Sequence, residues 1–171
     1  TATVSGTAGN PTGTVTFFDN GTQIGTPQTI TTTGVVTTAA VQTSSLTVGT
    51  HTITANYSGD GTYKSSIGTL TPSQVVNKAA SGTALKSSAN PSMFGQSVTF
   101  TATVTGVSGT NPTGTVTFLD NGTSIGTGAL STTGGVTTAS LSTSSLAVGS
   151  HPITASYGGD ENYTSSTSSP A

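Results

Sequence analysis

The chain has 171 residues with a net charge of −2, three lysines, five acidic side chains, no Arg, no Trp and no Cys. Three lysines cannot neutralise a run of phosphates, so the composition argues against nucleic-acid binding, and the absence of Cys excludes disulfides and thiol catalysis. Thr, Val and Ile supply 61 residues, which rules out a mostly helical protein because β-branched side chains favour strands.

The first predicted strands form a hairpin. Residues 11–26 (PTGTVTFFDNGTQIGT) alternate apolar and polar side chains on either side of Asn20-Gly21. This pair is the strongest short-range hairpin signal, because a type I′ turn needs positive φ at both of its central positions. We therefore expect two antiparallel strands joined at this turn. The preceding Asp19, like Asp120 in a second copy of the motif, is explained by the hairpin alone.

Two further segments alternate cleanly. Residues 51–57 (HTITANY) place every second side chain on one face, from His51 to Tyr57, and residues 95–106 (GQSVTFTATVTG) carry Thr at every second position after Val98. A period of two with one apolar face is typical of an antiparallel sheet that faces solvent on one side. We expect both segments to be strands with a hydroxyl-coated outer face.

The sequence repeats after about one hundred residues, a length that suits a whole small β-domain. Residues 11–26 recur as 112–127 with 14 of 16 positions identical, and residues 35–66 recur as 135–166 with 20 of 32 identical. Such a period is too long for one turn of a solenoid. Short strands with turn signals about every ten residues predict two tandem immunoglobulin-like β-sandwiches, an all-β fold.

The predicted domains cover residues 1–78 and 79–171. A comparison of where the two copies of the repeat begin and end indicates which strands each domain contains. Residues 82–100 lead into the second copy and have no counterpart before the first. Residues 67–77 follow the first copy and have no counterpart after Ser166. We therefore expect the first sandwich to lack its opening strand and the second its closing strand within this chain, as in an excerpt from a longer array.

Both copies resemble a known family. The motif PTGTVTF-x-DNGT-x-IGT, followed by SSL-x-VG-x-H-x-ITA-x-Y-x-GD-x-x-Y-x-SS, is similar to the bacterial immunoglobulin-like (Big) repeat group, and residues 75–100 resemble that family's junction and first strands. The resemblance covers essentially the whole chain. It implies tandem modules of secreted or surface-anchored bacterial proteins, such as adhesins, large repetitive surface proteins and filaments, in which many modules are spacers.

The equivalent His51 and His151 are the first candidates for chemistry. Each begins a predicted strand, has a Tyr six residues later and is followed by an acidic residue, Asp60 or Asp160. A His near an Asp suggests acid–base chemistry or a metal, but a metal site needs three or more convergent ligands, and neither copy offers a second His or a thiolate. We expect packed or capping histidines, with no metal and no cofactor.

Asp60, Asp160 and Glu161 are the candidates for calcium ligands. Calcium between tandem surface domains is held by several carboxylates and carbonyls, and each junction here offers only one or two carboxylates. We therefore favour a turn role, in which Asp accepts backbone N–H bonds. The other repeated residues are predicted to be structural: Asn20, Gly21, Asn121, Gly122, Tyr57, Tyr157, Tyr63 and Tyr163.

Two other kinds of site can be assessed from motifs. Sequons at Asn20, Asn56, Asn121 and Asn162 are candidate glycosylation sites in a host that modifies Asn. A nucleophile elbow with ordered triad partners and a carboxylate pair for glycoside hydrolysis are both missing from the sequence, so we do not expect an enzyme.

These observations favour a non-catalytic structural module of an extracellular or cell-surface bacterial protein: a stalk, an adhesin spacer or a filament subunit. Its 41 Thr and 25 Ser make the surface polar without charge, which fits an extracellular location. No apolar run is long enough for membrane insertion. Its partners would be neighbouring Ig-like repeats or identical subunits, which could polymerise by adding a strand to an open sheet edge. The alternative is an adhesive module that recognises a glycan or a host surface through end loops such as residues 105–111.

Overall fold

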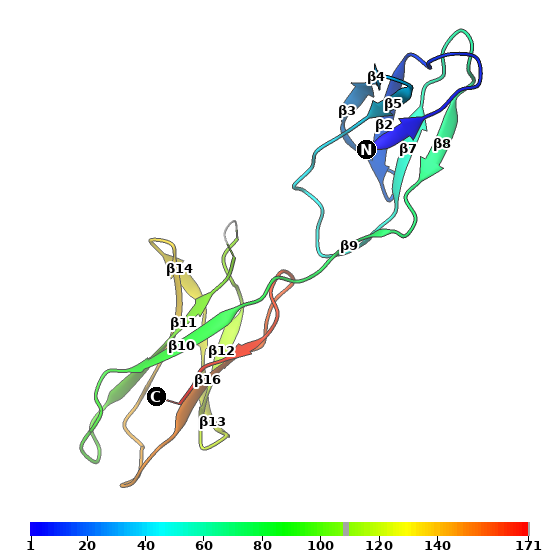
Figure 1. Cartoon of the computed structure of the whole chain (residues 1–171). Coiled ribbons are helices and arrows are strands. Elements are labelled where there is room, and N and C mark those ends of the chain that lie inside the picture. The colour runs from blue at the N-terminus through cyan, green and yellow to red at the C-terminus, as the bar shows by residue number, and fades with distance from the viewer. Residues whose placement is uncertain (108–109, 171) are drawn as a thin grey trace. The chain divides into compact units, whose positions relative to one another are not determined.

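The computed structural model describes residues 1–107 and 110–170, and it is built from strands (Figure 1). Within this described part there is no helix, and so none that is long and apolar enough to cross a membrane. The chain divides into two compact units, Thr1–Asn77 and Lys78–Ala171, which we call unit 1 and unit 2. The predicted all-β class is confirmed.

Unit 1 contains two main antiparallel sheets. Its strands are β1 (Ala2–Val4), β2 (Thr14–Asp19), β3 (Thr22–Thr29), β4 (Thr31–Thr33), β5 (Val36–Ala39), β6 (Gly49–His51), β7 (Ile53–Tyr57), β8 (Ser66–Thr69) and β9 (Gln74–Val76). One sheet has the order β1-β5-β4 and the other β3-β2-β7-β8, while β6 and β9 form a separate pair. The two main sheets enclose a core that contains Val15, Phe17, Ala39 and Tyr57.

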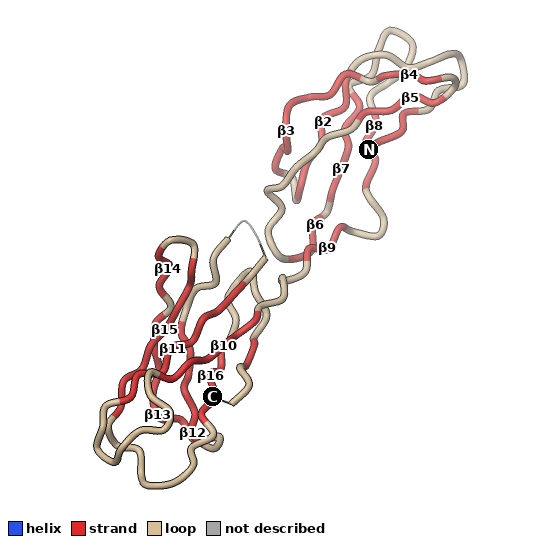
Figure 2. Tube along the Cα trace, turned by 60° about the vertical axis from the view of Figure 1, so that its left-hand side comes forward, coloured by secondary structure: helices blue, strands red, loops and turns tan. Residues whose placement is uncertain are grey.

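Unit 2 repeats the two main sheets of unit 1 with β10 added to one of them, and its described residues contain no counterpart of the β6–β9 pair. Its strands are β10 (Gly82–Ser87), β11 (Val98–Thr105), β12 (Thr115–Asp120), β13 (Thr123–Ala129), β14 (Ser131–Thr133), β15 (Val136–Thr143), β16 (Ile153–Tyr157) and β17 (Ser166–Thr167). The sheets have the orders β10-β11-β15-β14 and β13-β12-β16-β17. Figure 2 shows that in each unit the strands alternate with loops at both ends of the sandwich.

The hairpins form at the Asn-Gly turns. Asn20 and Gly21 have φ values of 47° and 86°, and Asn121 and Gly122 have φ values of 47° and 81°. Positive φ at both central positions is the geometry of a type I′ turn, whose twist matches that of the flanking strands. Strand β2 pairs with β3, and β12 with β13, in antiparallel register across these turns.

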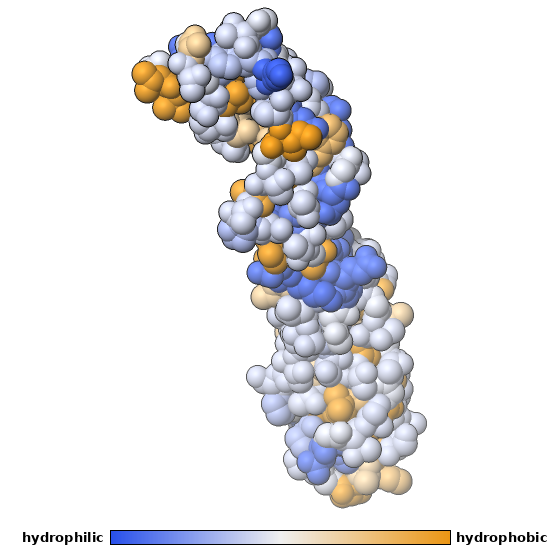
Figure 3. All heavy atoms as spheres, turned by 90° about the vertical axis from the view of Figure 1, so that its right-hand side faces the viewer, coloured by the Kyte–Doolittle hydropathy of each residue, from blue (hydrophilic) through white to orange (hydrophobic). Residues whose placement is uncertain are grey.

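The alternation of residues 95–106 separates core from surface as expected. On β11, Val98, Phe100, Ala102 and Val104 are each at most 3% exposed, and burying a large apolar side chain contributes about 1.5–3 kcal/mol. The outward threonines form hydroxyl pairs with the neighbouring strand, as in the 2.8 Å contact between Thr99 Oγ1 and the Ser142 hydroxyl. Figure 3 shows the resulting surface, mostly close to the middle of the hydropathy scale, with hydrophobic residues in small separate areas.

The two units differ at two sheet edges. In unit 2, β10 pairs with one edge of β11, whereas in unit 1 no strand of the described residues pairs with the corresponding edge of β1. In unit 1, β9 pairs with β6, whereas no described strand pairs with residues 149–151 of unit 2. Residues 74–87 therefore supply β9 to one unit and β10 to the other.

Candidate functional site

In the described part of the chain, two clusters of titratable side chains occur once in each unit. One cluster lies where β7 and β16 begin and pairs a His with an Asp. The other follows the end of the same strands and is built around an Asp in a turn. We call them the His–Asp pair and the turn cluster. Because five strand residues separate them, His51 is not brought together with Asp60, nor His151 with Asp160.

The His–Asp pair joins the start of the β7 or β16 region to the end of the neighbouring strand. His51 Nδ1 lies 2.8 Å from Asp19 Oδ2, and its Nε2 lies 2.8 Å from the carbonyl oxygen of Thr47. In unit 2 the distance between His151 Nδ1 and Asp120 Oδ2 is 2.6 Å. The interpretation that the two Asp residues serve the hairpin alone is therefore wrong: antiparallel pairing of β2 with β7, and of β12 with β16, carries each carboxylate to a His.

The surroundings of each His favour its protonated form. A carboxylate and a carbonyl oxygen can only accept hydrogen bonds, and a ring that donates from both nitrogens is an imidazolium. The carbonyl of Thr47 is the largest cause that raises the pKa of His51, followed by the hydrogen bond to Asp19. In unit 2 the carbonyl of Ala147 and the Asp120 carboxylate raise the pKa of His151 in the same order.

This geometry predicts a loss of stability as the solution becomes alkaline. A pKa that is raised in the folded state contributes stability that is fully present below the unfolded value of about 6.5 and is lost as pH rises through the folded value. In the D19N/D120N variant an amide can donate to a neutral imidazole, so we expect a melting temperature that varies less with pH than that of the wild type. Thermal melts at pH values on both sides of 6.5 test this, and parallel pH curves for the two proteins would contradict it.

The turn cluster uses both oxygens of its carboxylate. Asp60 Oδ1 accepts the backbone N–H groups of Thr62 and Tyr63, each at 2.7 Å. Its Oδ2 accepts the N–H of Thr12 at 2.7 Å and the hydroxyl of Thr12 at 3.0 Å. The backbone N–H groups of Thr12, Thr62 and Tyr63 hold the pKa of Asp60 well below its usual range.

Unit 2 repeats the turn cluster bond for bond. Asp160 Oδ2 accepts the N–H and the hydroxyl of Thr113 at 2.8 and 2.9 Å, and Oδ1 accepts the N–H groups of Asn162 and Tyr163, each at 2.8 Å. Burial acts to raise the pKa of Asp160, but the N–H of Thr113 and the other donors outweigh it and lower the pKa to about 2. The carboxylate is thus kept ionised by donors from its own unit.

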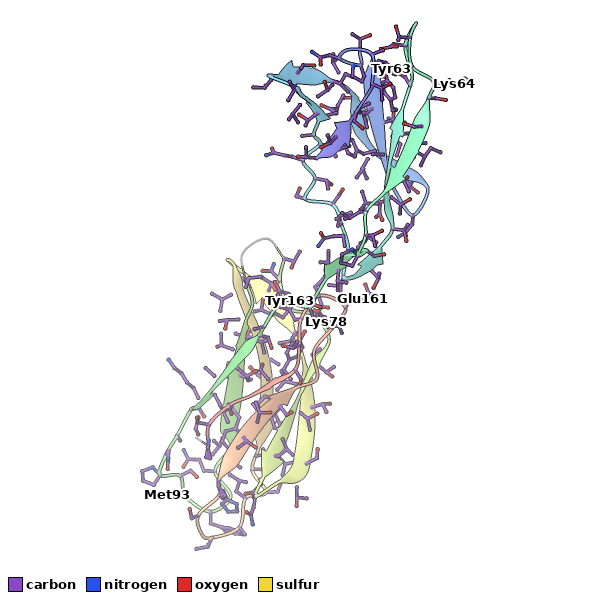
Figure 4. All side chains as sticks on the ribbon, turned by 45° about the vertical axis from the view of Figure 1, so that its right-hand side comes forward. Tyr63, Lys64, Lys78, Met93, Glu161 and Tyr163 are labelled. Carbon is purple, nitrogen blue, oxygen red and sulfur yellow. The ribbon has the colours of Figure 1, made fainter. Side chains whose placement is uncertain are left out.

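The candidate calcium ligands are not assembled into a site. The oxygens of Asp60 and Asp160 already face donors, and Glu161 is exposed at the same end of unit 2 as Lys78 and Tyr163 (Figure 4). Among residues 1–107 and 110–170, no three His, Asp or Glu side chains come close enough together to hold a metal ion.

Two tyrosines complete each turn cluster. In unit 1 the hydroxyl of Tyr57 donates to the carbonyl of Thr12 at 2.6 Å. In unit 2 burial raises the pKa of the equivalent Tyr157 to about 12, and the nearby Asp160 carboxylate adds to this increase. Tyr63 accepts the N–H of Ala8 at 2.8 Å and donates to the carbonyl of Gly9. The hydroxyl of Tyr163 likewise contacts the carbonyls of Val107 and Thr110, at 3.0 and 2.6 Å. The hydroxyls of Tyr57, Tyr63 and Tyr163 thereby tie the loop before each hairpin to the turn, whereas the buried hydroxyl of Tyr157 has no hydrogen-bond partner among the described residues.

The sequons and the candidate recognition loop lie in different surroundings. Asn20, Asn121 and Asn162 are all exposed. Asn20 also uses its Oδ1 to accept the N–H of Thr52 at 3.0 Å. Asn56 lies within β7 and its Oδ1 is buried. In the loop at 105–111, residues 108 and 109 lie outside the described part of the chain.

Sequence reasoning missed several members of the turn cluster. Thr12 and Thr113 hold the carboxylates, and Gly6 and Gly106 lie against Tyr63 and Tyr163: a Cβ added at Gly106 would stand 2.4 Å from Cε1 of Tyr163. Each of these residues occurs at the equivalent place in both copies. That double occurrence was the available signal, although it does not say which residues touch.

Comparison with known proteins assigns both units to one family. The family model of the bacterial Ig-like domain (group 3) matches residues 1–77 and 85–171. No curated protein sequence matches the chain. A solved structure of the fibronectin(III)-like modules of Clostridium thermocellum CbhA aligns with 98% of this chain and 83% of its own, with 18% sequence identity and a TM-score of 0.35. The chain therefore belongs to the bacterial Ig-like domain family of group 3 and consists of two tandem β-sandwiches of that family.

Proposed function

We propose that this chain is a non-catalytic structural segment of an extracellular bacterial protein, serving as part of a stalk, an adhesin spacer or a filament. The observation that carries the proposal is that the hydrogen bonds of the two Asp turns and of the two His–Asp pairs recur in both units, each joining groups of the same unit. The carboxylates of Asp60 and Asp160 each accept four hydrogen bonds, and each His binds an Asp and a carbonyl. A carboxylate whose two oxygens each accept two hydrogen bonds stabilises the fold, and its acceptor capacity is already used by donors of its own unit.

The surface supports the same role. The hydroxyl groups of Thr and Ser provide its polarity, and only eight side chains of the chain carry a formal charge. Low charge permits close side-by-side packing of copies, since little repulsion opposes it. Membership of a bacterial Ig-like family and the absence of Cys from the sequence fit a location outside the cell.

Each unit also folds through its own contacts, as a spacer requires. The strand pairs of unit 1 and those of unit 2 are all internal to the respective unit. An array of such domains gains length by adding units, without new chemistry in any one of them.

Single-molecule force spectroscopy on the whole chain tests this proposal. We expect two separate unfolding events with extended lengths of roughly 25–28 nm for the 77 residues of unit 1 and roughly 31–34 nm for the 94 residues of unit 2, because an extended residue spans about 3.3–3.6 Å. Two events with repeatable refolding after relaxation support a mechanical spacer. Smooth extension without discrete unfolding events would overturn the proposal, because a segment that extends continuously under force does not maintain a fixed length. The D160A variant is the internal control, since it should weaken only the event that belongs to unit 2.

A further inference from the structure

The two Asn-Gly turns share one local sequence but face different residues of the neighbouring strand. The sequence Asp-Asn-Gly-Thr occurs at 19–22 and again at 120–123, and no other Asn of the chain precedes a Gly. The backbone of the two turns is alike, with a φ of 47° at both Asn20 and Asn121. A Cβ added at the Gly of either turn would meet nothing within 4 Å, so both turns are equally open. A difference in their chemistry must therefore come from outside the turn.

In unit 1 the turn is held by two reciprocal hydrogen bonds. The antiparallel register that places Asp19 opposite Ile53 brings Asn20 opposite Thr52. The N–H of Asn20 donates to the carbonyl of Thr52 at 3.0 Å. The N–H of Thr52 donates in return to the side-chain Oδ1 of Asn20, also at 3.0 Å. The amide group of Asn20 is therefore tied to the neighbouring strand.

Unit 2 lacks the second of these bonds. Its register places Asp120 opposite Ile153, so Asn121 faces Pro152, which occupies the position of Thr52. Proline has no N–H, so this position offers no donor to the side chain of Asn121. The remaining bond, from the N–H of Asn121 to the carbonyl of Pro152, measures 3.3 Å. Asn121 is thus exposed and without the anchor that holds Asn20.

An Asn that precedes a Gly can react with its own backbone. The nitrogen of the Gly gives its proton to a base in the solvent and attacks Cγ of the Asn, and the absence of a Cβ leaves this approach open. An N–Cγ bond forms, the Cγ–Nδ2 bond breaks, and the nitrogen leaves as ammonia after taking up a proton from water. A second water molecule opens the resulting cyclic imide at either carbonyl and gives aspartate or isoaspartate. Nothing is oxidised or reduced, and water is the co-reactant.

The bond between Thr52 and Asn20 opposes this reaction. For Cγ to meet the nitrogen of the following residue, the Asn side chain has to turn, and in unit 1 this motion first breaks the hydrogen bond to Oδ1. The net stability of an ordinary intramolecular hydrogen bond corresponds to a factor of about two to ten in rate. In unit 2 Pro152 imposes no such cost on Asn121.

We propose that Asn121 is a site of spontaneous deamidation and that Asn20 is its protected counterpart. The modification goes beyond the structural role proposed above and does not depend on it. Aspartate at position 121 adds a carboxylate directly after Asp120, which binds His151. Isoaspartate lengthens the main chain within the turn, whose geometry sets the pairing of β12 with β13.

Tryptic digestion separates the two turns. The chain has three Lys and no Arg, so one peptide covers residues 1–64 and contains Asn20, and another covers residues 87–171 and contains Asn121. In the test, the whole folded chain is incubated in mildly alkaline buffer prepared with water enriched in the heavy isotope of oxygen. Samples taken at intervals are digested in ordinary water, so that only conversions before digestion carry the label. Fragment mass spectrometry measures the label at each Asn.

We expect Asn121 to convert about two- to tenfold faster than Asn20 in the folded chain. In urea the contact with Thr52 is lost, so the two sites should convert at nearly the same rate, because their local sequences are the same. Exchanging the facing residues should exchange the rates: Thr52→Pro should accelerate conversion of Asn20, and Pro152→Thr should slow that of Asn121. Each substitution installs the residue that the other unit carries at that position, so both variants should fold.

Equal rates at the two sites of the folded chain would overturn the proposal, as would a rate at Asn121 that Pro152→Thr leaves unchanged. A faster reaction at Asn20 would also overturn it, since the N–H of Thr52 would then activate the amide carbonyl instead of restraining it. A folded chain that stays unmodified while the chain in urea reacts fully would mean that the turn itself prevents the attack, which contradicts the site. None of these results affects the spacer role, because freshly prepared chain is used to measure unfolding under force.

Discussion

Replacing Asp160 by alanine is expected to lower the free energy of unfolding of unit 2 by about 2–3 kcal/mol, which corresponds to the loss of a charged acceptor that serves several donors. The substitution leaves the N–H groups of Thr113, Asn162 and Tyr163 without their acceptor. It also frees the Thr113 hydroxyl, so the loop before β12 loses its link to the turn after β16. Water can reach part of this site, which keeps the expected loss below the sum of the separate bonds.

Calorimetric melting of the whole chain measures the effect, with Glu161→Ala as the matched control. Glu161 is the neighbouring acid and is exposed, so its removal should change stability by less than about 0.5 kcal/mol. Acid adds a second readout. A folded pKa of about 2 contributes stability that is present above the ordinary value of 3.8 and is lost as pH falls toward 2, and the variant lacks that contribution. Equal stability of D160A and the wild type would contradict the role of the turn cluster.

Local patterns account for the parts of the fold that the sequence predicted well. A period of two depends only on neighbouring residues, so the buried face of β11 could be assigned from Val98 to Val104 without knowing its partners. The Asn-Gly turns are equally local, since positive φ is a property of two residues. The repeat itself supplied the number of domains, because identical segments adopt the same structure.

The contacts of the clusters lie beyond such local reasoning. Asp19 and His51 are 32 residues apart, and Asp60 and Thr12 are 48 apart. Which residues meet at these distances depends on the register in which β2 pairs with β7, and the hydrophobic pattern specifies the face of a strand but not its partner. An Asp before Asn-Gly is fully explained by the turn, so no local pattern in the sequence indicates its bond to a His.

Replacing Gly106 by alanine is expected to destabilise unit 2, because the added methyl group would collide with a buried tyrosine ring. Its added Cβ would stand 2.4 Å from Cε1 and 2.5 Å from Cζ of Tyr163, which is 1% exposed and packs in the core of unit 2. Gly106→Ala must therefore displace the ring and strain the hydroxyl bonds to Val107 and Thr110. We expect a loss of roughly 1–3 kcal/mol in unit 2, the usual cost of overpacking a core.

Three comparisons separate this contact from the general effect of adding a methyl group. Gly158→Ala should be nearly neutral, because a Cβ there meets nothing within 4 Å. Gly6→Ala should cost less than Gly106→Ala, because Tyr63 is only half-buried and its ring can move outward. In the double variant G106A/Y163A the two losses should not add, because truncating the ring removes the clash. Urea unfolding measures these losses of unfolding free energy. If the losses of the two single variants add up in the double variant, Gly106 is required for its backbone conformation and not to leave space for the ring of Tyr163.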